Sequence, residues 1–372
     1  MKSLPAPMPE RLPLVISAFV VSALCGFVVI PLVISFCRHY GLYDMPSERK
    51  VHHHAIPRLG GIVFLPSMLV SFLLCISVFE SVVHHREVTM SLWSMMFFIS
   101  LLIIYVTGLL DDILGLPAMA KFIAQIIAAA LLPASSLWLN DAYGFFGFSD
   151  ISAPIGYILT VFVVVLINNA INLIDGIDGL AGGLAFLALA GFLYAFVREG
   201  LWSYAILIAG LMGVLIPYLY FNLFGDPTKG RKIFMGDSGS LTLGFILAFL
   251  FIKFASNSNS ALPYRRDGLI LSFTLLIVPV FDVFRVALYR LRHRQPLFKA
   301  DKHHIHHKLL ACGLSQHAAL VVILLLALAF MGVNLWLTQV LDWTITPVFL
   351  VDVVLYILFH LVVNLLIRRS RS

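Results

Sequence analysis

Charged residues are scarce in this sequence. Asp, Glu, Lys and Arg make up 12% of the 372 residues, whereas hydrophobic residues make up 60%. A soluble globular protein has about 25% charged residues, which cover its water-facing surface. A soluble fold is therefore excluded, and the apolar composition also excludes a disordered chain. The 25 glycines and 17 prolines follow no repeat, which excludes a fibrous protein. The class that remains is an all-α polytopic integral membrane protein.

Cysteine is also rare, and its spacing forms no motif. The four cysteines are far apart and form no CxxC pair, so neither a disulfide framework nor a zinc site is indicated. The net charge of +6 could indicate nucleic acid. In a membrane protein, however, basic residues gather in cytoplasmic loops, and we expect no nucleic acid partner. The first apolar run lacks an A-x-A-like cleavage site, so we expect a first span and not a signal peptide.

Long apolar segments dominate the sequence instead. A helix of about 20 apolar residues crosses the ~30 Å hydrocarbon layer of a bilayer. The sequence predicts about eleven such helices in one transmembrane domain over residues 1–372. Pro279 lies inside the ninth segment, where it can break the helix. The predicted segments are 12–36, 59–80, 91–110, 117–133, 154–172, 179–197, 201–222, 239–255, 268–289, 317–337 and 345–367.

The basic residues predict the orientation. With the N-terminus outside and the C-terminus cytoplasmic, 17 of the 25 Lys and Arg residues lie in cytoplasmic segments and six on the opposite side. Lys253 and Arg285 lie within predicted spans. On the outer side, the aromatic loop 134–153 suggests a short hairpin, and the polar loop 256–267 suggests a plain solvated connection.

Four clusters of polar residues remain near the ends of spans, all on the predicted cytoplasmic side. A charge at the centre of a membrane helix costs about 2.5–3.5 kcal/mol, so such residues are functional candidates. In the first cluster, Asp111 and Asp112 end the third segment and Lys121 opens the fourth. They could be solvated loop acids with a snorkelling lysine, or they could serve a metal, a proton or a phosphate.

The second cluster is the stretch NNAINLIDGIDGLAGG, which begins at Asn168. On a continuous helix, Asn169, Asn172 and Asp175 would share nearly one face. Such oxygen ligands suit Mg²⁺. Asp178 follows among glycines that let backbone approach a ligand or helix closely. The alternative is a polar loop that breaks the helix and packs through glycine.

The third cluster runs from Asn222 through Gly239 and precedes the eighth segment. It contains Asp226, Asp237 and Ser238, with the basic residues Lys229, Arg231 and Lys232 nearby. A helix N-terminus can receive phosphate oxygens, or the Asp237 or Ser238 side chain can cap it.

The fourth cluster contains four histidines, for which we consider a zinc site, a solvated loop and a phosphate-binding patch with neighbouring Arg and Lys. These histidines are His303, His304, His306 and His307. A further run, 52–54, could be a solvated basic loop.

Acidic and amide oxygens combined with basic groups on one membrane face indicate a Mg²⁺–diphosphate site. A site at the membrane surface would bring together a soluble nucleoside diphosphate compound and a lipid phosphate. A secondary transporter is the alternative from another class. Its polar residues would lie near the bilayer midplane, at broken helices, whereas these acids end their spans.

Several motifs together resemble one enzyme family. They are PRLGG (57–61), GLLDD with Lys121 downstream, NNAINLIDGIDGLAGG, FMGDSGSLTLG and HHIHH. The sequence resembles the polyprenyl-phosphate N-acetylhexosamine-1-phosphate transferases, glycosyltransferase family 4. The HIHH pattern is similar to the WecA-type branch of O-antigen, lipopolysaccharide, common-antigen and teichoic-acid linkage synthesis. The MraY-type phospho-MurNAc-pentapeptide transferases, with three consecutive histidines, are the alternative branch.

The resemblance implies an enzyme of the bacterial cytoplasmic (inner) membrane with its active site on the cytoplasmic face. It would transfer a sugar-1-phosphate, GlcNAc-1-phosphate in the commonest case, from a UDP-N-acetylhexosamine to undecaprenyl or another polyprenyl phosphate and release UMP. Mg²⁺, or Mn²⁺ in its place, would be the cofactor. The lipid phosphate would attack directly. Whether the chain forms a homodimer is left open by the sequence.

The resemblance also implies roles for individual residues. Asn172 and Asp237 would hold the metal, with Asp175 close to it. Asp111 and Asp112 would orient or deprotonate the lipid phosphate. The remaining family positions would contact substrate: Lys121 at a phosphate, Asp178 and Asn222 at the uridine end, and His304, His306 and His307 at the phosphates or the sugar.

Overall fold

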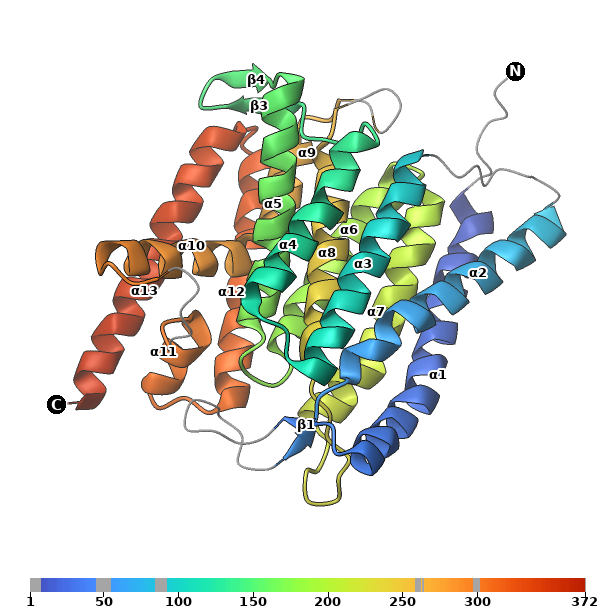
Figure 1. Ribbon diagram of the computed structural model, residues 1–372. Helices are drawn as coiled ribbons and strands as arrows, with labels where there is room; N and C mark the ends of the chain where they lie inside the picture. The colour runs from blue at the N-terminus through green and yellow to red at the C-terminus, as the bar shows by residue number, and fades with distance from the viewer. Residues whose placement is uncertain are drawn as a thin grey trace. The chain divides into compact units, whose positions relative to one another are not determined.

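The computed structural model describes residues 8–44, 55–83, 92–257, 262, 264–296 and 302–371 (Figure 1). Most of these residues lie in α-helices, which confirms the all-α prediction. The run 52–54 lies outside the described residues. The elements are α1 (Met8–Tyr40), β1 (Tyr43–Asp44), β2 (Ile56–Pro57), the 3₁₀ turn η1 (Gly60–Val63), α2 (Phe64–Val83), α3 (Leu92–Leu114), α4 (Ala118–Ala134), β3 (Asp141–Phe145), β4 (Phe148–Asp150), α5 (Ala153–Ile174), α6 (Leu180–Arg198), α7 (Trp202–Leu223), α8 (Gly236–Ala255), α9 (Gly268–Leu275), α10 (Ile277–Arg292), α11 (Ile305–Ala311), α12 (Gln316–Gln339) and α13 (Ile345–Arg371).

Each of the eleven predicted segments contains helix. Within the described part of the chain, nine helices are long and apolar enough to cross a membrane, or ten if the bent pair α9–α10 counts as one span. The predicted fourth span, α4, has 17 residues and is shorter than a typical crossing. The protein is therefore a polytopic membrane protein. The count of eleven crossings and the sides of the two termini stay predictions.

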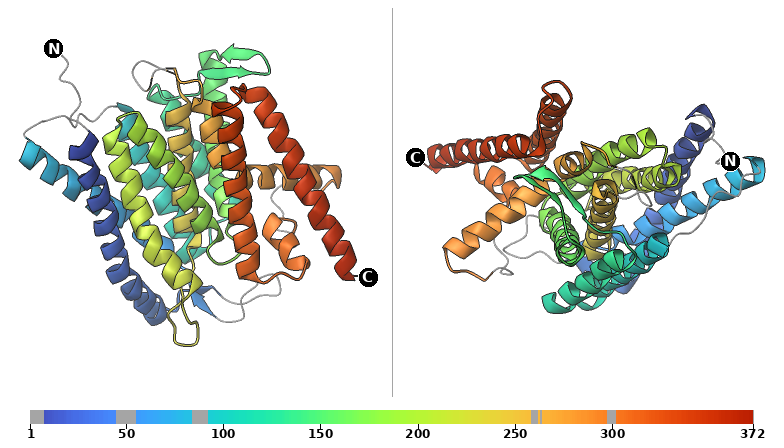
Figure 2. Two further views of the ribbon diagram at one scale, coloured as in Figure 1. Left: turned by 180° about the vertical axis from the view of Figure 1, so that it is seen from behind. Right: turned by 90° about the horizontal axis from the view of Figure 1, so that it is seen from above.

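The chain divides into two compact units. Unit 1 comprises Met1–Pro117 and Ala185–Leu243, and unit 2 comprises Ala118–Leu184 and Gly244–Ser372. In unit 1, α1 packs along α7 (Figure 2). Glycine makes this close packing possible, because a Cβ added at Gly26 would overlap Pro217 and one at Gly213 would overlap the backbone of Phe19. Small residues at such contacts are typical of membrane helices, which associate by close van der Waals packing.

In unit 2, the predicted break in the ninth segment is present. The helix stops at Leu275, resumes at Ile277 and bends by 73°. The break comes shortly before Pro279, which cannot donate a backbone hydrogen bond to the preceding turn. As a result, α10 runs across the direction of α12 and α13 (Figure 1).

The predicted hairpin in loop 134–153 is also present in unit 2. Strands β3 and β4 are antiparallel, and Phe145 pairs with Phe148. Phe145 packs edge-on against Phe349 of α13 and joins an apolar cluster with Ile270 and Val348. The hairpin therefore covers the N-terminal end of α13, and the prediction is confirmed.

The prediction for loop 256–267 is wrong in part. Ser256 and Arg265 are buried, with 2% and 8% of their surface exposed. The guanidinium of Arg265 donates to the backbone oxygen of Phe254 and lies 4.5 Å from the centre of its ring. A guanidinium on an aromatic face, with a carbonyl partner, satisfies the charge inside the fold, so this part of the loop is packed and not solvated.

Candidate functional site

The carboxylate of Asp112 closes the N-terminus of α8 in unit 1. Asp112 lies near the end of α3 and is 4% exposed. The backbone N–H groups of Asp237 and Ser238 donate to its two oxygens, with N···O distances of 2.8 and 2.9 Å. The first N–H groups of a helix have no partner within the helix and attract negative charge. Asp112 thus caps α8 from another helix, whereas one of the two alternatives from the sequence is a cap by the Asp237 or Ser238 side chain.

Glycine allows the two helix ends to come this close. A Cβ added at Gly108 of α3 would lie 2.6 Å from the backbone oxygen of Asp237. Gly236 opens α8 with φ +71°, a conformation that favours glycine, and faces the Asp112 carboxylate. The glycines of the GLLDD and GDSG motifs therefore serve the packing of α3 against the start of α8.

The PRLGG motif joins the same corner through its backbone. The N–H of Phe234 donates to the oxygen of Pro57 at 2.8 Å. In return, the N–H groups of Gly60 and Gly61 donate to the oxygens of Phe234 and Met235 at 2.8 and 2.7 Å. A Cβ at Gly61 would overlap the backbone of Gly239. Three motifs that are far apart in the sequence thus meet at the first turn of α8.

The other candidate residues of unit 1 differ in burial. Asp111 and Asp237 are half-buried, and Oδ1 of Asp111 accepts from the N–H of Leu116 at 2.7 Å. Asn222 is 2% exposed, and its side-chain amide donates to the backbone oxygen of Ile233 at 2.9 Å. Asn222 therefore holds the segment that leads into α8, while Asp111 and Asp237 keep part of their surface in contact with solvent.

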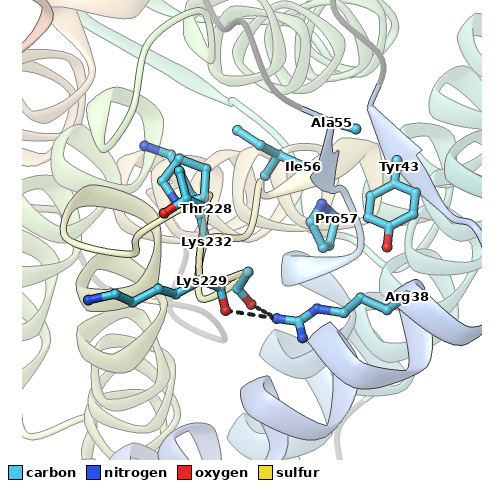
Figure 3. Close-up of a pocket in the computed structure, with 10 residues that line it drawn as sticks. Arg38, Tyr43, Ala55, Ile56, Pro57, Thr228, Lys229 and Lys232 are labelled. Carbon is cyan, nitrogen blue, oxygen red and sulfur yellow. Dashed lines mark hydrogen bonds between the residues drawn. The ribbon is translucent and has the colours of Figure 1, made fainter.

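A polar pocket of about 300 Å³ lies beside this corner in unit 1 (Figure 3). Its walls are the end of α1, the β1–β2 ribbon and the segment before α8. Arg38 donates to the backbone oxygens of Lys229 and Gly230, and Lys229 lies 3.8 Å from Asp226. The side chain and backbone N–H of Thr228 donate to Asp226 and lower the pKa of this exposed carboxyl. Lys232 also lines the pocket, so its rim is basic.

In unit 2, the second cluster begins on α5 but does not stay helical. Asn169 and Asn172 lie on α5, which ends at Ile174, and Asp175 is its C-cap. The side-chain amide of Asn169 donates to Gln125 of α4. The predicted single helical face therefore holds for Asn169 and Asn172 and fails at Asp175, which begins the turn that contains Asp178.

His306 packs directly against this turn. A Cβ at Gly176 would overlap the imidazole ring of His306, so the ring rests on the backbone between Asp175 and Asp178. His306 is 1% exposed, and neither of its ring nitrogens has a hydrogen-bond partner. Burial lowers the pKa of His306 to about 3, and the neighbouring His307 adds to this effect. The imidazole is therefore neutral at pH 7.

The histidine cluster is packed and not solvated. His304 is 5% exposed, and its ring stacks parallel to that of His306 with 5.9 Å between the centroids. The rings of His306 and His307 are 4.1 Å apart. Lys308 follows on α11, and its Nζ lies 3.3 Å from Nδ1 of His360 in α13; burial lowers the pKa of Lys308 to about 8. The solvated-loop alternative is thus wrong for His304 and His306.

Asp282 of α10 anchors the start of this cluster. It is fully buried, and its Oδ2 lies 2.8 Å from Nδ1 of His304. Its Oδ1 accepts from the guanidinium of Arg285 at 2.7 Å and from the N–H of Ile305 at 3.0 Å. The hydroxyl of Tyr356 lies 3.5 Å from the same oxygen. One carboxylate therefore holds both the His304 ring and the first turn of α11.

Comparison with known proteins fits these motifs. The family model described as glycosyl transferase family 4 matches residues 93–255. A Bacillus subtilis (strain 168) protein named "Probable undecaprenyl-phosphate N-acetylglucosaminyl 1-phosphate transferase" is 32% identical over 330 residues, which cover 86% of this chain and 84% of the relative. The chain belongs to glycosyl transferase family 4.

Two further relatives of this family 4 protein carry the name "Undecaprenyl-phosphate alpha-N-acetylglucosaminyl 1-phosphate transferase". The Yersinia pestis protein is 29% identical, and the Escherichia coli (strain K12) protein is 28% identical. Each match covers 85% of this chain and 83% of the relative. The resemblance seen in the motifs is thus confirmed at the level of the family.

The candidate residues of the family 4 protein fall into two sets, one in each unit. Unit 1 brings together Asp111, Asp112, Asp237 and, through the segment before α8, Asn222. Unit 2 holds the rest, among which contact is seen between His306 and the Asp175–Asp178 turn. Lys121 is half-buried on α4. The second set is Lys121, Asn172, Asp175, Asp178, His304, His306 and His307.

Sequence reasoning missed Asp282. It lies in the apolar stretch 268–289, whose composition predicts a span and in which Arg285 stands out only as a charge within that span. A usable signal was present, because a carboxylate three residues from an arginine inside an apolar helix must be paired to be tolerated.

The donor chemistry of these residues suits Mg²⁺ better than a softer metal. Among the described residues, no group of three or more His, Cys, Asp and Glu side chains is placed to hold a metal ion. Zinc needs such a set, whereas Mg²⁺ keeps several waters and uses one or two carboxylates with substrate phosphates. The half-buried carboxylate of Asp237 at the first turn of α8 fits that requirement.

Proposed function

We propose that this family 4 protein transfers GlcNAc-1-phosphate from UDP-GlcNAc to undecaprenyl phosphate at the cytoplasmic face of a bacterial inner membrane and releases UMP. The names of three relatives that align over most of the chain support this function. The observation that carries the proposal is the meeting of PRLGG, GLLDD and GDSG at the first turn of α8, where Asp111 and Asp237 stay partly accessible. Family membership favours a transferase over a transporter.

The sugar and the branch follow from the same relatives. Their names specify N-acetylglucosaminyl transfer, which favours the WecA-type branch over phospho-MurNAc-pentapeptide transfer. The reaction would open a cell-envelope polysaccharide pathway.

The chemistry requires little from a protein base. A phosphate monoester has a second pKa near 6, so the lipid phosphate is mostly dianionic at pH 7 and can attack the β-phosphorus of UDP-GlcNAc directly. The P–O bond to UMP breaks as the new one forms, and UMP leaves with the electron pair. The protein must orient two anions and neutralise their charge.

The adjacent acids Asp111 and Asp112 differ in burial, and we assign them different roles for this reason. Asp112 is buried and already accepts two backbone N–H groups, so we assign it to holding α8 in place. Asp111 keeps accessible surface and is the acid that would orient the lipid phosphate. Lys121 would contact a phosphate, and His304, His306 and His307 would contact phosphates or sugar.

Mg²⁺ is the cofactor we propose, and it would neutralise charge on the diphosphate when bound. We assign Asp237 as its carboxylate ligand and Asn172 as its amide ligand, with Asp175 nearby. This assignment rests on the motif resemblance and on the donor chemistry of these side chains, and not on their placement in the fold. Asp178 would serve the uridine end. The same resemblance gives Asn222 this task, but its buried hydrogen bond to Ile233 favours support of the segment before α8.

UMP release by the purified protein in detergent tests the function. The assay contains undecaprenyl phosphate, Mg²⁺ and a panel of UDP-sugars, and UDP-GlcNAc should give the fastest lipid-dependent release. Asp237→Ala should abolish release while the folded yield is retained. Release from none of the sugars would refute the proposal. Exchange of labelled UMP into UDP-GlcNAc without lipid, or a trapped phospho-aspartate, would refute direct attack.

A further inference from the structure

The carboxylate of Asp282 and the ring of His304 form a buried pair in unit 2 that no motif of the sequence predicted. We propose that Asp282 is a positioning residue that fixes the tautomer and the orientation of His304, so that Nε2 of His304 is the ring nitrogen presented to substrate. The proposal rests on the proposed function, in which His304 contacts phosphate or sugar.

The hydrogen bonds around Asp282 define its charge. Its Oδ1 receives a guanidinium N–H from Arg285 and the backbone N–H of Ile305, and the whole side chain is 0% exposed. A buried carboxyl with two donors on one oxygen, one of them a permanent cation, is ionised. An ionised carboxylate can only accept hydrogen bonds.

The charge of Asp282 then determines the proton on His304. Because Oδ2 can only accept, the ring atom 2.8 Å away, Nδ1, must be the donor. A neutral His304 is therefore protonated at Nδ1 and has its lone pair at Nε2. An unprotonated Nε2 accepts a hydrogen bond, for example from a sugar hydroxyl. Asp282 thus fixes the tautomer, as the aspartate of a serine-hydrolase triad does for its histidine.

Several contacts keep the ring from turning. His304 is the N-cap residue of α11 with an extended backbone, and Asp282 binds both its ring and the next N–H, that of Ile305. The parallel ring of His306 covers one face of His304. Arg285 donates in addition to the backbone oxygen of His303. The ring therefore has fixed neighbours on its Nδ1 side and on one face.

The charged and titratable groups around His304 come from three helices. Among the groups with described contacts around His304, the carboxylate of Asp282 is the one that carries a negative charge. The others are Arg285 from α10, His306, His307 and Lys308 from α11, and Tyr356 and His360 from α13.

The tautomer of His304 can be measured without any activity. Protein with ¹⁵N-labelled histidine is examined by NMR at pH 8, and the His304 signals are identified by their loss in His304→Gln. We expect a protonated Nδ1 and an unprotonated Nε2, and we expect Asp282→Asn to abolish this pattern. A proton on Nε2 in the natural protein, or an unchanged pattern in Asp282→Asn, would overturn the proposal.

A double-mutant cycle tests the functional consequence. Asp282→Asn should lower kcat for UMP release by up to roughly 10⁴-fold, the loss known for the same change in a serine-hydrolase triad. If Asp282 acts through His304, the double variant with His304→Gln should be no more than about threefold slower than His304→Gln alone. Fully multiplicative losses would mean that Asp282 acts elsewhere.

Two further variants distinguish the positioning role of Asp282 from a general loss of folding. Asp282→Glu keeps the carboxylate and should recover part of the activity lost in Asp282→Asn. Tyr356→Phe removes a hydroxyl that lies 3.5 Å from Oδ1 of Asp282, and it should leave the His304 tautomer unchanged. If the unaltered protein releases no UMP, the proposed function fails, whereas the NMR result still decides the tautomer.

Discussion

The carboxylate of Asp112 accepts the backbone N–H of Asp237 across 2.8 Å and so ties the end of α3 to the start of α8. The residue next to it, Asp111, accepts the N–H of Leu116 just beyond the end of α3. Adjacent acids in one motif therefore have different tasks, which asparagine substitutions can separate.

Asp112→Asn should lower both stability and activity. An asparagine can accept only one of the two N–H groups, and loss of a helix cap costs about 1–2 kcal/mol. Asp111→Asn keeps the acceptor for Leu116 and should retain the melting temperature while UMP release falls at least roughly tenfold, because the charge near the lipid phosphate is lost. Thermal unfolding in detergent and the UMP assay measure both effects. Equal stability loss in the two variants would contradict the division of roles.

Gly176→Ala should destabilise the fold. The new methyl group would overlap the buried His306 ring, and overpacking of this kind costs about 1–3 kcal/mol. Gly332→Ala is the matched control, because a Cβ there meets nothing within 4 Å, and alanine in a helix should be neutral or mildly stabilising. Unfolding temperatures compare the two. If His306→Ala in the Gly176→Ala background fails to restore stability, His306 is not the obstacle.

Acid should destabilise the protein through His306. The unfolded chain binds a proton as pH falls below about 6.5, whereas buried His306 remains neutral down to about 3. The unfolded state therefore binds more protons in this window, and the stability present above pH 6.5 is lost as pH falls toward 3. At pH 5 the loss is about 2 kcal/mol.

The control for this pH effect is His306→Leu, which removes the titrating ring. Its melting temperature should fall less between pH 7.5 and pH 5 than that of the unaltered protein. An equal fall in both proteins would assign the acid sensitivity to other groups.

A buried polar trio in unit 2 gives a further prediction. The amide of Asn334 in α12 donates to Asp352 of α13 at 3.0 Å and to the hydroxyl of Thr274 in α9 at 2.8 Å. Asn334→Leu would leave Asp352 buried without this donor and should cost about 1–3 kcal/mol. Asn334→Leu with Asp352→Leu removes both partners and should recover most of that loss. Melting temperatures of the single and double variants decide this, and an additive loss would argue against the pairing.

The helical elements could be predicted from the sequence because apolar length alone specifies a membrane helix. All eleven predicted segments contain helix, and the break near Pro279 and the hairpin in 134–153 are present. Local chemistry determines these features: proline removes a donor, and Gly144 and Gly147 adopt positive φ at the hairpin turn.

The contacts between distant segments could not be predicted in the same way. The sequence marked Asp112, Asp237 and His304 as unusual but did not show that Asp112 caps α8 or that Asp282 holds His304. These pairings depend on which helix ends pack together. The burial of Arg265 could not be predicted for the same reason. The sequence of a polar loop does not indicate that one of its cations will lie on an aromatic ring.

The bend between α9 and α10 has a consequence for the surrounding lipid. The eight residues of α9 extend about 12 Å, less than half of the ~30 Å hydrocarbon layer, before α10 turns away by 73°. A break in a membrane helix is tolerated only where protein or water covers the freed backbone groups. Leu276, the residue at the break, is 1% exposed, so the fold itself shields this point of the bent pair from lipid.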